Sequence, residues 1–94
     1  MIKAEIVTEI ANKTGIEKVV VQEVVESLMT SMKNSLMNGE NIYLRGFGSF
    51  ILKKRAAKIG RNISQNTTIK IPAHNIPAFK PCREFKEGVK SKVK

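Results

Sequence analysis

The segment from Lys53 to Ile71 constrains the fold most, because its residues favour strands while apolar side chains are sparse. Its last five residues, 67–71, have high β propensity, and the stretch 59–66 before them is rich in turn residues. We therefore expect a basic hairpin with its tip at 62–66. Two strands without a sheet behind them are marginal in water, so such a hairpin needs a partner to pack against.

The charge of the chain is concentrated in the same half. The net charge is +9, and the stretch 41–83 contains nine Lys and Arg residues but no Asp or Glu. The residues outside it carry eight Lys and eight acidic side chains, so their charges cancel. The whole excess lies in one segment, which indicates a polyanionic partner rather than general solubility.

The first half of the sequence has the apolar period of helices. One helix contains Ile6, Val7 and Ile10, and Thr14-Gly15 would end it because Gly accepts a left-handed backbone. A second helix is predicted over 17–37, ending at Asn38-Gly39. Its apolar stripe is broad, which predicts burial on more than one side. We also expect Met29, Met32 and Met37 to pack in the core.

The second half reads as strands over 41–45 and 49–53, joined by a turn at 46–48. Pro72 is expected to end the return strand of the hairpin, and Pro77 and Pro81 to punctuate a short connection. Phe85, Val89 and Val93 lie four residues apart, which predicts a closing helix. With 94 residues, a core from one chain alone would be marginal, and oligomerisation is a common remedy.

Several classes of protein and of site do not fit this sequence. No apolar run reaches the roughly 18 residues of a membrane span, and the start Met1-Ile2-Lys3-Ala4-Glu5 has no signal-peptide core, so a cytoplasmic protein is expected. Stretch 47–50 lacks the spacing of a phosphate-binding loop. His74 has no carboxylate or thiol pair at metal-ligand spacing. Cys82 is the single cysteine, so it cannot form a disulfide within the chain. We predict no enzyme, no cofactor, no metal site and no small-molecule substrate.

Four short motifs follow one another in the second half of the chain: 45–50 (Arg-Gly-Phe-Gly-Ser-Phe), 60–62 (Gly-Arg-Asn), 71–73 (Ile-Pro-Ala) and 77–81 (Pro-Ala-Phe-Lys-Pro). In these motifs, their order and their spacing, the sequence resembles the family of HU and integration host factor, the histone-like DNA-binding proteins of bacteria. The resemblance implies an α+β fold with two N-terminal helices, a three-stranded antiparallel sheet with an extended β-ribbon arm, and a short C-terminal helix. The single domain 1–94 would comprise a helical part (1–40), the sheet and arm (41–75) and a C-terminal segment (76–94).

The resemblance also implies an intertwined dimer whose two arms enter the minor groove of DNA. Phe47, Phe50 and Phe79 match the aromatic residues of the family's dimer core. The residues expected to contact DNA lie on the arm, at its base and on the body: Lys3, Arg45, Lys53, Arg55, Lys58, Arg61, Asn62, Ile63, Lys70, Lys80 and Arg83.

The chain departs from the family's pattern at the arm tip and before the last helix. Ile63 takes the place of the Pro that wedges between base pairs, and an apolar Ile is itself a side chain used for this purpose. Asn66 replaces a Gly of the arm turn, where Asn tolerates the left-handed backbone. Cys82 replaces a Gly before the last helix.

The resemblance therefore implies a nucleoid-associated protein that binds, bends or condenses duplex DNA largely without sequence preference. Two alternatives stay open. Arg45 before the Gly-Phe-Gly turn resembles the site-specific branch of the family, and a basic RNA-binding protein would have a similar charge. The partner subunit is expected to be a second copy of the chain, with a paralogue as the other option.

Overall fold

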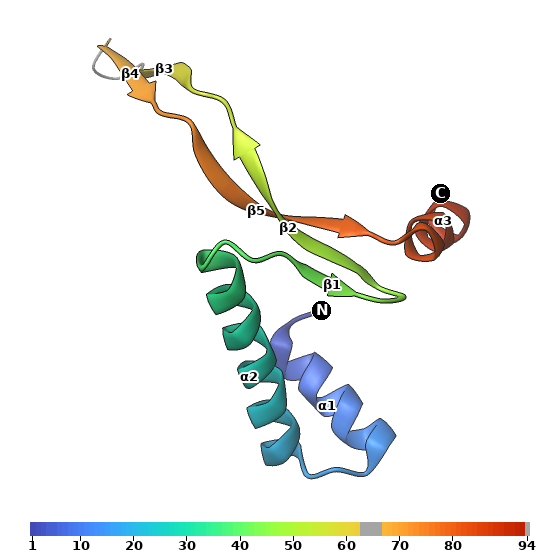
Figure 1. The fold of residues 1–94 in the computed structure, drawn as a ribbon. Helices are drawn as coiled ribbons and strands as arrows, with labels where there is room; N and C mark the ends of the chain where they lie inside the picture. Colours follow the sequence, from blue (N-terminus) through green and yellow to red (C-terminus); the bar gives the residue numbers. More distant parts are fainter. Residues whose placement is uncertain (63–66, 94) are drawn as a thin grey trace. The chain divides into compact units, whose positions relative to one another are not determined.

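A computed structural model describes residues 1–62 and 67–93, with the backbone alone for 61, 62, 67 and 68. Three helices and five strands follow one another along the chain (Figure 1): α1 (Lys3–Thr14), α2 (Lys18–Met37), β1 (Ile42–Leu44), β2 (Gly48–Arg55), β3 (Lys58–Asn62), β4 (Thr67–Ile71), β5 (His74–Pro81) and α3 (Arg83–Lys92). The predicted α+β class is confirmed. The chain divides into two compact units, 1–35 and 36–94.

The helical unit is a hairpin of two antiparallel helices (Figure 1). Gly15 ends α1 with φ of 76°, and its N–H donates to the carbonyl of Ala11. This left-handed cap is what the Thr14-Gly15 pair predicted. Gly39 has φ of 85° just after α2, so the predicted end of the second helix is also confirmed.

The core of one chain is very small. In the described residues, Val7 and Val21 are the buried apolar side chains, at 2% and 4% exposure. Val24 and Leu28 on α2 stay more than half exposed, and Met37 is 81% exposed. Met29 is 40% exposed, so the expectation that the three methionines pack in the core is wrong for Met29 and Met37 within one chain.

The second unit contains two antiparallel sheets. Strands β1, β2 and β5 form the first in the order β1-β2-β5, and strands β3 and β4 form a separate two-stranded ribbon (Figure 1). The register runs from Gly48 opposite Pro81 to Arg55 opposite His74, and resumes with Lys58 opposite Ile71. Two residues on each side, 56–57 and 72–73, interrupt the ladder. The predicted hairpin with its return strand over 67–71 is confirmed.

The segment around Pro77 and Pro81 corrects one expectation. It is strand β5 rather than a short connection, and it pairs with all eight residues of β2. Pro cannot donate a ladder hydrogen bond, but β5 lies at the sheet's edge, where such a donor is not needed on the outer side. Helix α3 follows directly, with the N–H of Cys82 donating to the carbonyl of Phe47 at 2.9 Å.

Candidate nucleic-acid interface

The strand register sorts the basic side chains of the sheet by face. Directly opposed residues in adjacent strands point to the same side, and successive residues alternate. Lys53 and Arg55 of β2 therefore share one face with Lys80, which lies opposite Ser49. We call this side of β1-β2-β5, carrying Lys53, Arg55 and Lys80, the basic face. All three side chains are exposed.

The other side of the same sheet is aromatic. Phe50 lies directly opposite Phe79, with ring centroids 4.8 Å apart. Phe47 stacks on Phe85 of α3 at 5.4 Å and lies 5.1 Å from Phe79. Phe79 is nevertheless 39% exposed and Phe47 45% exposed, so the cluster is only partly covered by its own chain. Lys54, between Lys53 and Arg55 in sequence, lies on this second side opposite Asn75.

The β3–β4 ribbon carries further predicted residues. Lys58 pairs with Ile71 and Lys70 pairs with Ile59, so the two lysines lie on opposite faces of the ribbon. Both are exposed, and Ile59 is 71% exposed. Arg61 and Asn62 pair with Thr68 and Thr67 in the backbone register. The expected wedge, Ile63, lies outside the described residues.

Beside the β1–β2 turn, two further predicted residues, Arg45 and Arg83, lie together with Lys80 of the basic face. Gly46 has φ of 83°, a left-handed conformation that suits Gly, and it allows the tight turn after Arg45. Arg45 from this turn, Lys80 from β5 and Arg83 from α3 line one open hollow. Tyr43 also lines it, is 72% exposed, and lies opposite Ser49 on the basic face. The sequence interpretation missed Tyr43, although its alternation with Ile42 and Leu44 already placed it on the polar side of the strand.

Two of the predicted cations form ion pairs among the described side chains: Lys3 with Glu26 at 2.9 Å and Arg83 with Glu87 at 3.2 Å. The hydrogen bond from Lys3, its charge and a hydrogen bond from Gln22 together lower the pKa of the Glu26 carboxyl. Lys3 is therefore already paired with an exposed carboxylate, and a phosphate that binds Lys3 would have to displace Glu26.

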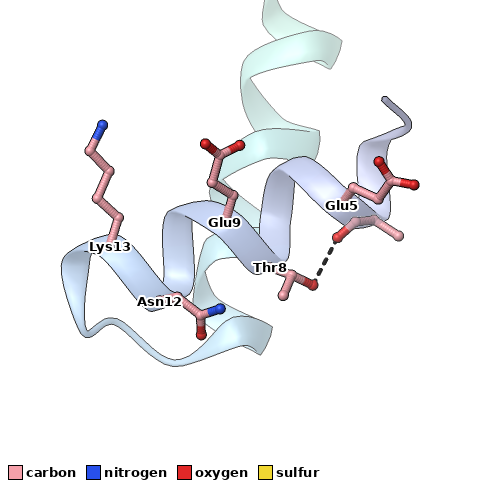
Figure 2. Close-up of a pocket in the computed structure, with 6 residues that line it drawn as sticks. Glu5, Thr8, Glu9, Asn12 and Lys13 are labelled. Carbon is pink, nitrogen blue, oxygen red and sulfur yellow. Dashed lines mark hydrogen bonds between the residues drawn. The ribbon is translucent and has the colours of Figure 1, made fainter.

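Other surface features do not form a competing site. A hollow along α1 is lined by six residues of that single helix, five of which are labelled in Figure 2. Its carboxylates, Glu5 and Glu9, would repel a polyanion, and Thr8 is occupied with the carbonyl of Ala4 at 3.0 Å. No three His, Cys, Asp or Glu side chains in the described part of the chain are grouped to hold a metal ion. No helix of residues 1–62 and 67–93 is long and apolar enough to cross a membrane.

Comparison with known proteins agrees with this geometry. Residues 1–90 match the family model described as bacterial DNA-binding protein. The DNA-binding protein HU of Thermus thermophilus is 40% identical over 88 residues, which cover 94% of this chain and 91% of that one. Integration host factor subunit beta of Marinobacter nauticus is 41% identical over 95 residues, covering 100% and 97% of the two chains.

A solved structure, the cocrystal of Anabaena HU with DNA, superposes with a TM-score of 0.89 and 34% identity. The match covers 95% of this chain and 97% of that one. Because the family model and these relatives match the chain almost from end to end, this chain belongs to the bacterial DNA-binding protein family of HU and integration host factor.

Proposed function

We propose that two copies of this chain form an architectural protein that binds duplex DNA and bends it through the minor groove. The observation that carries the proposal is the basic face, which continues along the chain into a ribbon that has two strands among the described residues. The stretch 41–83 holds nine cations and no acid, so nothing in it competes with phosphate. The Anabaena relative was crystallised with DNA, which supports the same partner here.

The proposal of a dimer rests on the apolar side chains that a single chain leaves exposed. Two buried valines are a small core, while Phe47, Phe79 and Phe85 are each more than a third exposed. Burial of a Phe or Leu side chain contributes roughly 1.5–3 kcal/mol, so covering these rings and the α2 stripe with a second chain would add greatly to stability. The partner is a second copy of the chain or a paralogue with the same apolar surfaces.

Binding would come first from phosphate neutralisation. Each phosphate contacted by Lys or Arg releases condensed counterions, a contribution that does not depend on base sequence. The basic face, with Lys58, Arg61 and Lys70 on the ribbon, supplies these contacts. An apolar side chain at the tip, Ile63, would enter a base step and stabilise the bend. The protein would act in the cytoplasm, on the nucleoid, without catalysing a reaction.

The dimer has a direct consequence for stability. Because folding and association would be coupled, the melting temperature should rise with protein concentration. Thermal unfolding followed by circular dichroism over about a hundredfold range of concentration checks this, alongside the mass in solution. A melting temperature that does not change, together with the mass of one 10.5 kDa chain, would contradict the dimer.

The choice of nucleic acid tests the proposed function itself. A-form RNA has a wide, shallow minor groove and a deep, narrow major groove, which do not suit a ribbon and wedge built for the minor groove of DNA. We expect clearly tighter binding to duplex DNA than to duplex RNA of equal length, measured by fluorescence anisotropy at one salt concentration. Equal or tighter binding to RNA would instead support the basic RNA-binding alternative.

A site-specific DNA-bending protein is the second candidate function. It is favoured by Arg45, which lines one hollow together with Lys80 and Arg83. Affinity for random duplexes compared with duplexes selected from a random pool separates the two. A difference of tenfold or less, about 1.4 kcal/mol, fits the general binder.

A further inference from the structure

The basic face also carries a titratable group, His74, at the root of the ribbon. His74 is the only histidine of the chain and the first residue of β5. It lies directly opposite Arg55, so the imidazole and the guanidinium share the basic face at the root of the ribbon. The side chain is exposed and is not part of a metal-binding group within the described residues.

The ring of His74 is held by one hydrogen bond. Its Nδ1 lies 2.9 Å from the carbonyl oxygen of Pro72. A carbonyl oxygen only accepts, so Nδ1 carries the hydrogen and Nε2 is the nitrogen that gains or loses a proton. In the neutral ring Nε2 presents a lone pair, which a phosphate oxygen repels. In the charged ring Nε2 becomes a second N–H donor, and the bond to Pro72 is kept.

The groups around His74 on the sheet are cationic or neutral. Arg55 lies across the strand pair, and Lys53 lies two residues further along β2 on the same face, opposite Ile76. Lys58 follows beyond the interruption of the ladder, at the start of the ribbon. No acidic residue occurs anywhere in 41–83, so the sheet and ribbon offer a charged imidazole no anionic partner. A DNA phosphate drawn to Arg55 and Lys53 would be such a partner.

We propose that His74 is a pH-dependent phosphate contact, in which the charged imidazole donates from Nε2 to the DNA backbone beside Arg55. The inference rests on the proposed DNA binding and adds a regulation to the same surface. Binding of DNA then takes up protons, and affinity rises as the pH falls through the range in which histidine titrates, about pH 5 to 8. Because each chain has one such histidine, a dimer gains two phosphate contacts on acidification.

The test is the salt dependence of DNA affinity at about pH 8 and about pH 5.5. Each added phosphate contact steepens the slope of log affinity against log salt by about 0.9, so the unmodified dimer should steepen by about 1.8 at the lower pH. His74→Gln cannot take up a proton and should keep the shallow slope at both pH values. His74→Lys is charged throughout and should keep the steep slope at both.

If the salt slope of the Lys variant is the same at about pH 5.5 as at about pH 8, the protein fold and the DNA duplex are intact at the lower pH. If His74→Gln steepens with acidification as much as the unmodified dimer does, His74 is not the contact, although DNA binding stands. A Lys variant whose slope equals that of the Gln variant would also overturn the inference, because position 74 would then lie away from the phosphates. If none of the three proteins binds DNA at either pH, the proposed function itself fails.

Discussion

Raising the salt concentration from about 50 to about 200 mM should weaken binding of the dimer to duplex DNA by about 10³–10⁵, as expected for 6–10 neutralised phosphates. The physical reason is that the stretch 41–83 contains no acidic residue, so its cations, apart from Arg83 in its ion pair with Glu87, find their counter-charge on DNA. Anisotropy titrations at four or five salt concentrations measure this slope. A loss of less than about tenfold over this range would show that phosphate contacts contribute little.

The strand register supplies a matched set of variants for this measurement. Lys53 and Arg55 lie on the basic face, while Lys54 between them lies on the opposite face beside Asn75. Replacing Lys53 and Arg55 by Ala removes up to four contacts from a dimer and should flatten the slope by up to about 3.6. Lys54→Ala removes a cation from the same strand and should change the slope by less than about 1.

If the salt slope flattens by the same amount per removed charge in both variants, the overall charge of the protein, rather than the basic face, directs DNA binding. Because Lys53, Lys54 and Arg55 are all exposed, their replacement should leave the fold intact. Circular dichroism spectra of the three proteins provide the check on folding.

Substitution of Gly48 should have the largest effect on stability. A Cβ on this residue would lie 2.5 Å from the carbonyl oxygen of Lys80 and 2.8 Å from Cε1 of the Phe79 ring. The carbonyl belongs to the paired β5 strand and the ring to the aromatic cluster, so neither can move without disturbing the sheet. We expect Gly48→Ala to lower the free energy of unfolding by about 1–3 kcal/mol, the range for an overpacked core.

Gly88→Ala is the control for this substitution. A Cβ at Gly88 meets no atom within 4 Å, and the residue lies inside α3. Ala is favoured over Gly in a helix interior, so this variant should gain about 0.5–1 kcal/mol. Urea unfolding at one fixed protein concentration compares the two. Equal stability of the Gly48 variant and the unmodified protein would show that a Cβ at Gly48 has more room than the 2.5 Å to the carbonyl oxygen of Lys80 allows.

The sequence predicted most elements because their local signals agree with their surroundings. The period of three to four, closed by Gly15 and Gly39, predicted the ends of both long helices and the start of the second to within one residue. The return strand of the ribbon was predicted at its observed bounds, Thr67–Ile71. Strand β5 was misread because Pro77 and Pro81 are local breakers, and their tolerance depends on an edge position that only the sheet order reveals.

The composition of the candidate site followed from the sequence, but its geometry did not. An acid-free stretch of cations identifies a polyanion-binding segment without any coordinates. The pairing register of the strands is needed to place Lys54 on the opposite face of the sheet from Lys53 and Arg55. The ion pair of Lys3 with Glu26 joins residues 23 positions apart on two helices, so no local pattern predicts it. The packing of Phe85 against Phe47 and Phe79 likewise depends on tertiary structure.

The proposed mechanism of DNA bending depends on Ile63. Ile63 lies outside the described residues, so its role as a wedge stays a prediction from sequence. Burying an Ile side chain contributes roughly 1.5–3 kcal/mol, comparable to the few kcal/mol needed to unstack a base step. Ile63→Ala should therefore bend DNA much less while keeping most of the salt-dependent affinity. A variant that bends DNA as sharply as the unmodified protein would assign bending to the cationic residues instead.

End-to-end fluorescence energy transfer across a short duplex measures the proposed bending of DNA. With saturating unmodified protein, the two ends should approach one another and the transfer should rise to a plateau at two chains per duplex. The plateau should fall with Ile63→Ala at full occupancy, because the phosphate contacts remain while the wedge is lost. If the unmodified protein saturates the duplex and the transfer stays at the value of free DNA, the protein binds DNA without bending it and the account is wrong.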